Sequence, residues 1–576
     1  MFRRNAAAAL LLFALLSQNF SATRAQQPTP APATPQAQPA PAAPTPDIIE
    51  RIKDEGINRS QVMQTVEYLT DVIGPRLTGS PALRRANNWT KDRLTEWGLA
   101  NAHLEPWGPF GRGWTLKRFS AEVVEPQAFP LLAYPRAWSP GLDAPLTADV
   151  VLVDAKNEEE LQKYKGQLQG KIVLAGTVRE LKPHFDAVAK RLSEKELLEL
   201  ADAPDPAAQP RRPRTPPTPE QIAAARFGDR KTQFYYEEGV ALLVGSSPAG
   251  DGGMLQFVQQ ASVPQPFDTP FDKRVQPWQK DAPKLIPQIA LSNDHYNRLA
   301  RMIRQGERVR MSVNLQVEFD DTDPMAYNTV AEIPGSDLKD EVVMLGGHLD
   351  SWHTATGATD NAIGASVMME AVRILKAVGV QPRRTVRVAL WSGEEEGLLG
   401  SRAYVEQHFG KLETPAPTPS PAPPGPAEAR PTPQAMPAPP PSAHLLTKPE
   451  YEKFDAYFNL DNGTGRIRGV YMQGNDALRP LFRQWLAPFA DMGAQTLTLA
   501  NTGSTDHVSF DSIGLPGFQF IQDEIDYSAR THHSTQDTYE RIQEDDLKQA
   551  AVIMAAFVYQ TAMRDEKLPR KPAPGR

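Results

Sequence analysis

The chain reads VVMLGGHLD at residues 342–350, and no other stretch indicates its fold so directly. Four apolar residues predict a buried strand, and the two glycines that follow let the backbone approach a bound group closely. His348 and Asp350 come directly after them. Ligands of α/β sheets bind beyond the carboxyl ends of the strands, so the residues after each predicted strand are the candidates for chemistry.

Strands and helices alternate around this stretch. Apolar runs predict strands at 342–345, 385–391, 457–460 and 517–521, and amphipathic spacing predicts helices at 362–378, 397–409 and 547–563. This alternation predicts an α/β fold with a mixed central sheet and helices on both faces.

Acidic and imidazole side chains recur at these strand ends. The motifs are TDN at 359–361, SGEEEG at 392–397, NLDN at 459–462 and HHS at 532–534. Imidazole and carboxylate without thiolate form the ligand chemistry of a hydrolytic zinc site. Two cations that share one carboxylate need about five protein ligands, with a nucleophilic water between them. Five residues from separate strand ends or loops supply them: His348, Asp360, Glu395, Asp461 and His533.

Two further carboxylates have predicted roles beside these ligands. Glu394 adjoins a proposed ligand, so it can accept the proton of the nucleophilic water without coordinating a metal. Asp350 is placed to hold the far ring nitrogen of His348 and so to fix its tautomer.

Each motif alone has a simpler explanation. Asp360 could cap a helix, Glu394, Glu395 and Glu396 could form a solvated helix start, and the two histidines could be a surface pair. The recurrence of such clusters at nearly every strand end of one domain favours a functional site.

The rest of the chain divides into segments of different composition. The boundaries we expect are a signal peptide at 1–25, a Pro/Ala-rich linker at 26–46, the N-terminal part of the α/β domain at 47–140, a small mainly β inserted domain at 141–300, the main part of the α/β domain at 301–565 with a Pro-rich insertion at 414–442, and a tail at 566–576.

Composition bounds the location and the partners. Arg3, Arg4 and the apolar run at 6–16 are typical of an export signal, which predicts a secreted or periplasmic protein with no stable membrane span after signal removal. The absence of cysteine excludes disulfides and fits a bacterial export route. A net charge of -7 without a dense basic run excludes nucleic acid as a partner.

Taken together, the motifs resemble the M28 peptidases, which are dinuclear zinc aminopeptidases and carboxypeptidases. The order and spacing match from about 325 to 565, and the segment from about 47 also resembles theirs. Residues 141–300 resemble the protease-associated domain that many members insert, and the doubled histidine is similar to that of the plasma glutamate carboxypeptidase-like members. The resemblance implies the zinc-exopeptidase fold, two Zn²⁺ ions and a peptide or dipeptide substrate.

The resemblance also implies individual roles. His348 and Asp461 would bind one zinc, Glu395 and His533 the other, with Asp360 between them and Glu394 as the general base. The ligand of the histidine pair would be His533, because the family's ligand directly precedes a hydroxyl residue; His532 is the alternative. Three residues are candidate substrate or pocket contacts: Tyr527, Arg530 and Asp506.

Several functions share this fold. We expect an exopeptidase and place an aminopeptidase before a dipeptidase or carboxypeptidase. A glutaminyl cyclase has the same fold and normally one zinc, and a receptor-like binding protein would have lost metal ligands. The full set of ligand residues favours the enzyme. A homodimer is compatible with the sequence.

Overall fold

The computed structural model describes residues 47–208, 217–270, 273–413 and 444–571. Residues Asp47–Arg576 form one compact unit. The predicted signal peptide, the linker at 26–46 and the insertion at 414–442 lie outside the described residues.

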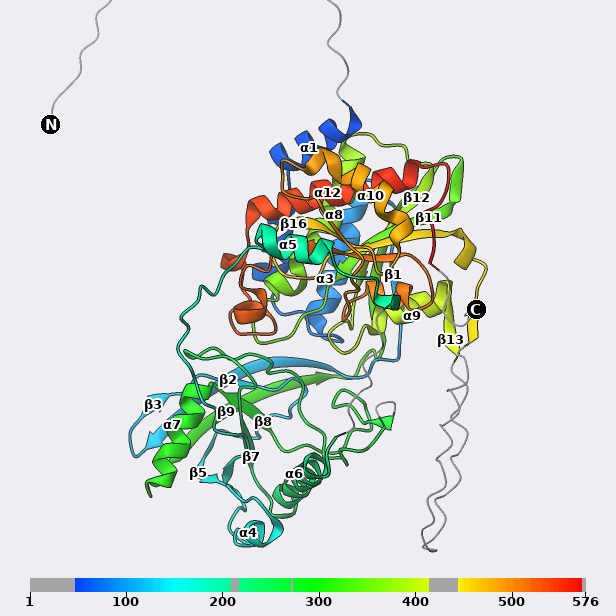
Figure 1. The fold of residues 1–576 in the computed structure, drawn as a ribbon. Coiled ribbons are helices and arrows are strands. Elements are labelled where there is room, and N and C mark those ends of the chain that lie inside the picture. The colour runs from blue at the N-terminus through cyan, green and yellow to red at the C-terminus, as the bar shows by residue number, and fades with distance from the viewer. Residues whose placement is uncertain (1–46, 209–216, 271–272, 414–443, 572–576) are drawn as a thin grey trace, which may run out of the picture. The chain divides into compact units, whose positions relative to one another are not determined.

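This unit contains two eight-stranded sheets, and the first of them is mixed, with helices packed around it (Figure 1). Its strands, in spatial order, are β1 (Ala100–Trp107), β10 (Ala326–Ile333), β12 (Arg384–Trp391), β11 (Leu338–His348), β15 (Phe454–Asn459), β18 (Gly517–Gln522), β16 (Ile467–Tyr471) and β17 (Thr496–Thr498). The four strands from β12 to β18 run parallel. β1 pairs antiparallel with β10, β10 with β12 and β16 with β18, whereas β17 pairs parallel with β16. The predicted mixed α/β fold is confirmed.

Alternation along the central strands explains why helices cover both faces. In β11, Val343 and Leu345 join one hydrophobic core, whereas Val342 and Met344 join another on the opposite face. The first core is covered by α1 (Ile48–Asn58), α2 (Val62–Glu67), α3 (Pro81–Glu96), α8 (Ile363–Ala377), α10 (Arg479–Leu486) and α12 (Glu544–Met563). The second is covered by α9 (Leu399–His408) and α11 (His507–Asp511).

The N-terminal helical pattern differs from its prediction in one respect. The apolar spacing from Ile48 to Val72 indicates one helix that ends at Gly74, but the structure breaks it into α1, α2 and a π-helical turn, Tyr68–Ile73. The break has tertiary and local causes. The backbone N–H of Gln61 donates to Glu370 of α8, and the hydroxyl of Ser60 accepts from the N–H at the start of α2.

A second eight-stranded sheet lies within residues 113–320. Its strands, in spatial order, are β3 (Phe129–Pro130), β2 (Gly113–Glu125), β9 (Arg310–Asp320), β5 (Leu146–Leu152), β6 (Ile172–Leu174), β7 (Leu242–Ser246), β8 (Gln288–Leu291) and β4 (Ala133–Pro135). Helices α4 (Glu158–Gln162), α5 (Glu194–Ala201), α6 (Pro219–Glu237) and α7 (Asn293–Arg304) also belong to this stretch. The sheet extends beyond the expected range 141–300 at both ends.

Strand register brings the predicted site motifs to one edge of the first sheet. His348 of β11 is paired with Trp391 of β12, and Gly346 is paired with Asn459 of β15. The GEE and LD motifs therefore leave their strands at nearly the same level as His348. Among the described helices, none combines the length and the apolarity needed to cross a membrane.

Candidate metal centre

Two histidines face one carboxylate at this edge. The Oδ1 atom of Asp360 lies 3.3 Å from Nε2 of His348, and its Oδ2 atom lies 3.2 Å from Nε2 of His533. Each histidine also meets a carboxylate of its own. His348 Nε2 is 3.3 Å from Asp461 Oδ1, and His533 Nε2 is 2.8 Å from Glu395 Oε2. The five residues expected to be ligands are therefore brought together, with Asp360 in the middle.

These separations suit a cation between the donor atoms. Donors at the usual zinc distances in a tetrahedral site lie about 3.3 Å from one another. The Oδ2 atom of Asp360 and the Oε1 atom of Glu395 are buried and accept no hydrogen bond from the described residues. A buried carboxylate oxygen without a donor is costly unless a cation neutralises it. Among the described residues, two groups of side chains have donor atoms close enough together to hold a metal ion: one is His348, Asp360 and Asp461, and the other is Asp360, His532 and His533.

Electrostatics lead to the same conclusion. Burial raises the pKa of Glu395 to about 7, with Asp360 adding to the increase, and burial raises the pKa of Asp506 and of Asp537 to about 7 as well. So many buried acidic groups in one place need positive charge, which divalent cations would supply.

The simpler explanations for these residues fail in the folded chain. Asp360 does not cap α8; instead the Oδ1 atom of Asn361 accepts a hydrogen bond from the N–H of Gly364 at 2.9 Å. The side chain of Glu395 is only 3% exposed, so the triple glutamate is not a solvated helix start.

Glu394 lies beside the ligands without joining them. Its Oε2 atom is 3.9 Å from His348 Nε2, beyond hydrogen-bond distance. Burial raises the pKa of Glu394 well above its ordinary value; Asp461 and Asp506 add to the increase, against a lowering by His348. A carboxyl group of raised pKa beside a metal-bound water is suited to taking and returning a proton.

Asp350 has contacts besides the one predicted with His348. The closest partner of the His348 Nδ1 atom is the backbone carbonyl of Asp350 at 3.1 Å, whereas the Asp350 carboxylate is 3.6 Å away. That carboxylate also accepts from the backbone N–H groups of Glu394 and Glu395 at 3.4 and 3.2 Å, and from the hydroxyl of Thr78 at 3.2 Å. Asp350 thus fixes the loop that carries the proposed base.

Two residues that the sequence did not single out hold the loop of Asp360. The Asp537 carboxylate accepts from the backbone N–H groups of Thr359 and Asp360 at 2.6 and 3.2 Å. Arg76 is fully buried and donates to five backbone carbonyls, three of them in the segment from Leu349 to Gly357. Nothing in the local pattern around Arg76 indicates this role.

A loop at residues 256–259, from the stretch of chain that forms the second sheet, holds His532 and His533 in place. The N–H of Phe257 donates to the carbonyl of His533 at 2.8 Å, and the amide of Gln256 donates to the carbonyl of His532 at 3.1 Å. The side-chain amide of Gln259 lies 3.2 Å from Nδ1 of His533. Because His533 has a φ of 51°, which is rare for a residue with a side chain, external support of this kind is needed to keep it in place.

Replacing Gln259 by alanine is expected to lower metal affinity about 10- to 100-fold, because the ring of His533 loses the partner that orients it. Titration of zinc into the metal-free variant and wild type measures this change. Gln260→Ala, one residue further along the same loop, is the matched control. Equal affinities for Gln259→Ala and wild type would contradict the role.

The two histidines of the pair differ in their contacts. His532 Nε2 reaches Asp360 only at 3.9 Å, and its side chain is 33% exposed, compared with 16% for His533. Only His533 contacts both Asp360 and Glu395, so the geometry favours it as the ligand.

The three candidate pocket contacts lie in different surroundings. Tyr527 stacks obliquely on His532, with ring centroids 4.8 Å apart, and the carboxylates of Asp360 and Asp461 contribute to the raised pKa of its hydroxyl after burial. Asp506 is fully buried, and its charge contributes to the raised pKa of Glu394. Arg530 pairs with Asp526 at 3.7 Å, and no contact joins it to the ligands in the described structure.

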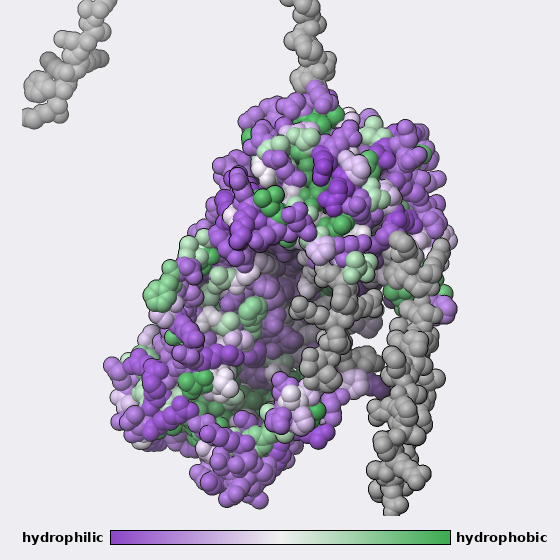
Figure 2. Space-filling model, in the orientation of Figure 1, coloured by the Kyte–Doolittle hydropathy of each residue, from purple (hydrophilic) through white to green (hydrophobic). Residues whose placement is uncertain are grey.

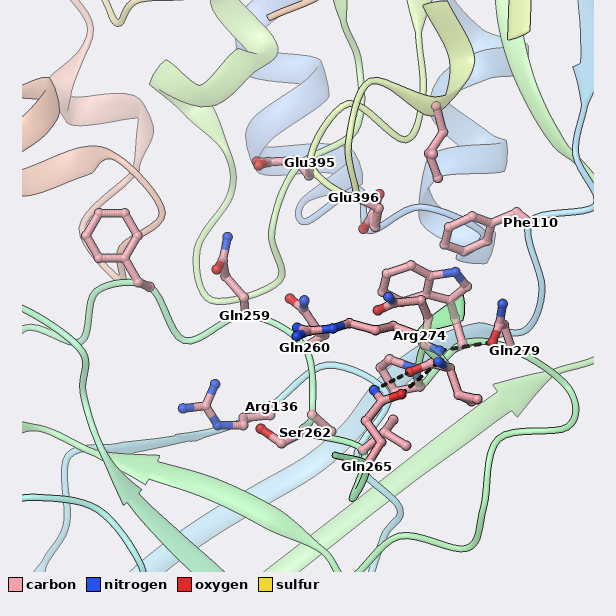
Figure 3. Close-up of a pocket in the computed structure, with 18 of the residues that line it drawn as sticks. Phe110, Arg136, Gln259, Gln260, Ser262, Gln265, Arg274, Gln279, Glu395 and Glu396 are labelled. Atoms are coloured by element: carbon pink, nitrogen blue, oxygen red, sulfur yellow. Dashed lines mark hydrogen bonds between the residues drawn. The ribbon is translucent and has the colours of Figure 1, made fainter. Parts of the chain in front are cut away.

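A cavity of about 940 Å³ opens beside the ligands. Glu395 and Glu396 lie on one side of it and Arg136, Gln259 and other residues of the stretch that forms the second sheet on the opposite side (Figure 3). Figure 2 shows the surface hollowed in this region, with mostly hydrophilic residues around the hollow. The site is therefore open to a ligand the size of a short peptide.

Comparisons with known proteins agree with this arrangement. A model of peptidase family M28 matches residues 328–416 and 441–558. Carboxypeptidase Q of Mus musculus is 26% identical over 518 residues, which cover 89% of this chain and 87% of that protein. An aminopeptidase of Bacillus subtilis is 28% identical over 236 residues, 40% of this chain and 43% of that protein.

The fold has a counterpart among solved structures. A crystal structure of a peptidase M28 precursor from Shewanella amazonensis matches with a TM-score of 0.58 at 23% identity, covering 92% of this chain and 98% of that one. The likeness extends over both sheets, since little of either chain is left uncovered.

Proposed function

Because the chain belongs to peptidase family M28, we propose that it is a dinuclear zinc exopeptidase that hydrolyses the terminal bond of peptides or dipeptides. One observation supports this most strongly. The two oxygens of Asp360 face two different histidines, at 3.3 and 3.2 Å, and each histidine has a further carboxylate beside it.

In this proposal His348, Asp461 and Asp360 hold one zinc, and His533, Glu395 and Asp360 hold the other. The bound ions would supply Lewis acidity and would lower the pKa of the nucleophilic water. Glu394 accepts the proton of that water and passes it to the leaving amine, while Asp350 keeps the backbone of Glu394 in position.

An aminopeptidase remains the first candidate for the end that is attacked, and the aminopeptidase of Bacillus subtilis supports it. The second candidate is a dipeptidase or carboxypeptidase. It is favoured by carboxypeptidase Q of Mus musculus, whose match covers 89% of this chain.

A panel of dipeptides tests the activity and its end preference. The zinc-loaded protein is expected to cleave free dipeptides and to lose this activity in excess chelator, because the donor set needs the ions to act. Amino-blocked and carboxyl-blocked analogues then separate the candidates: an aminopeptidase rejects the first, a carboxypeptidase the second and a dipeptidase both. Cleavage that persists undiminished after metal removal would contradict the proposal.

Metal content separates the enzyme from its alternatives. About two zinc ions per chain are expected from the shared carboxylate. A glutaminyl cyclase would hold about one and act on peptides with an N-terminal glutamine, and a receptor-like protein would bind the panel without turnover.

We also propose that the protein is exported. We further propose that the region around the second sheet is a protease-associated-like domain. The apolar run at 6–16 after Arg3 and Arg4, and the absence of cysteine, support export. N-terminal sequencing of the mature protein from the periplasm or medium tests it, with a new terminus expected near residue 26.

A further inference from the structure

A second cavity, of about 460 Å³, adjoins the one beside the ligands. It lies at the carboxyl ends of the parallel strands β6 and β7, where the segments Ala175–Thr177 and Gly245–Ser246 line it. One face of α6 closes it, because the lining residues of that helix recur at helical spacing: Gly228, Lys231, Thr232, Tyr235 and Tyr236. Carboxyl ends of parallel strands are a common place for ligands.

The charges around this cavity are of one sign. Arg136, Arg179 and Lys231 line it, and no aspartate or glutamate is among the described residues that do. None of the three cations has an ion pair in the described structure, although Lys231 lies over the ring of Phe227 at 5.4 Å. The neighbouring acid of α6, Asp229, faces the larger cavity and accepts from the N–H of Phe267 at 2.7 Å.

Arg136 connects the two cavities. It lines both of them, together with Pro248 and Ser262. Figure 3 shows its side chain across the larger cavity from Glu395 and Glu396. Burial lowers the pKa of the Arg136 guanidinium, because its charge is less well solvated than in water. A half-buried guanidinium without an acidic partner is an efficient carboxylate receptor, because its two parallel N–H groups match the two oxygens.

We propose that Arg136, Arg179 and Lys231 form a carboxylate-binding subsite, which holds the anionic end of the peptide substrate while its scissile bond lies at the candidate metal centre. This inference rests on the proposed function. Arg136 is placed to bind the carboxylate nearest the reaction site. Arg179 and Lys231 add positive charge beyond what one carboxylate neutralises, so a second carboxylate on the same end improves binding.

The carboxylate can come from the α-carboxyl group at the C-terminus or from an acidic side chain. Two peptide pairs distinguish these sources. The first pair differs only in a free or amidated C-terminus. The second pair keeps the amidated C-terminus and differs only in a C-terminal glutamate or glutamine.

Arg136→Gln is expected to lower kcat/KM for the free-carboxylate peptide about 10- to 100-fold, mainly through KM, and for its amide by less than about 2-fold. Loss confined to the glutamate peptide of the second pair would assign the subsite to an acidic side chain. The double variant Arg179→Gln/Lys231→Gln is expected to weaken the preference for glutamate over glutamine. Arg301→Gln, which removes an exposed arginine of the same part of the chain outside both cavities, is the matched control.

If Arg136→Gln lowered kcat/KM equally for both peptides of each pair, or for neither, the proposed subsite would be wrong. The proposed peptidase activity would not be affected by that result. A wild-type protein that cleaves no peptide would instead count against the proposed function. Calorimetric binding of succinate then still tests the subsite, with about 10-fold weaker binding expected for Arg136→Gln than for wild type. Equal succinate binding by the two would overturn it. Thermal unfolding and zinc content of each variant identify any loss due to misfolding, and Arg136→Lys, which keeps the charge, should recover part of the affinity.

Discussion

Replacing Glu394 by glutamine is expected to lower kcat about 10²- to 10⁴-fold while zinc content and KM stay near their wild-type values. Glutamine has nearly the same shape as glutamate but cannot accept the proton of the nucleophilic water. The carboxylate lies 3.9 Å from His348 and outside the five ligands, so its loss should not release metal. Steady-state kinetics on a dipeptide and elemental analysis of the dialysed protein measure both quantities.

The matched control for this variant is Glu396→Gln, two residues further along the same loop. Glu396 is also a buried carboxylate whose oxygens accept no hydrogen bond from the described residues, and it lines the same cavity as Glu395. A change of less than about 10-fold in kcat is expected for it, because the base contributes the larger effect. A greater loss in Glu396→Gln than in Glu394→Gln would assign the proton transfer to Glu396 instead.

Replacing Asp360 by alanine is expected to release both metal ions and to reduce turnover to the background rate. Its two oxygens face His348 and His533, so one substitution removes a ligand from each ion. Wild-type protein should keep about two zinc ions per chain after dialysis, and the variant should keep fewer than about one. Because bound metal stabilises the folded state, the variant should also lose the rise in Tm that zinc gives wild type.

Asp461→Ala provides the comparison that identifies Asp360 as the shared ligand. Asp461 contacts His348 alone among the two histidines, so its removal should weaken one ion and leave about one zinc per chain. If Asp360→Ala and Asp461→Ala each retained one ion, the shared role of Asp360 would be wrong.

Much of the fold could be predicted because the central strands are buried on both faces. Continuous apolar runs such as Val342 to Leu345 mark parallel strands of this kind, and the helices between them keep a period of 3.6. The prediction failed where contacts from distant residues compete with local pattern. The helix expected from Ile48 to Val72 is broken where Gln61 meets Glu370, 309 positions away. The second sheet is wider than expected because β2 and β9 pair with each other across almost 200 residues of chain.

The sequence by itself predicted the type of each candidate ligand and its place at a strand end or in a loop that follows a strand. A parallel sheet brings its carboxyl ends to one edge, so residues from 348 to 461 had to meet there. Only the tertiary structure decided that Asp360 lies between the two histidines, that Asp350 supports the loop of Glu394, and that Gln259 contacts His533. It also decided that Arg136 faces the site from the second sheet. The physical reason is that these contacts depend on how loops from separate sheets pack, and neither hydrophobic periodicity nor turn chemistry carries information about partners so far apart in the chain.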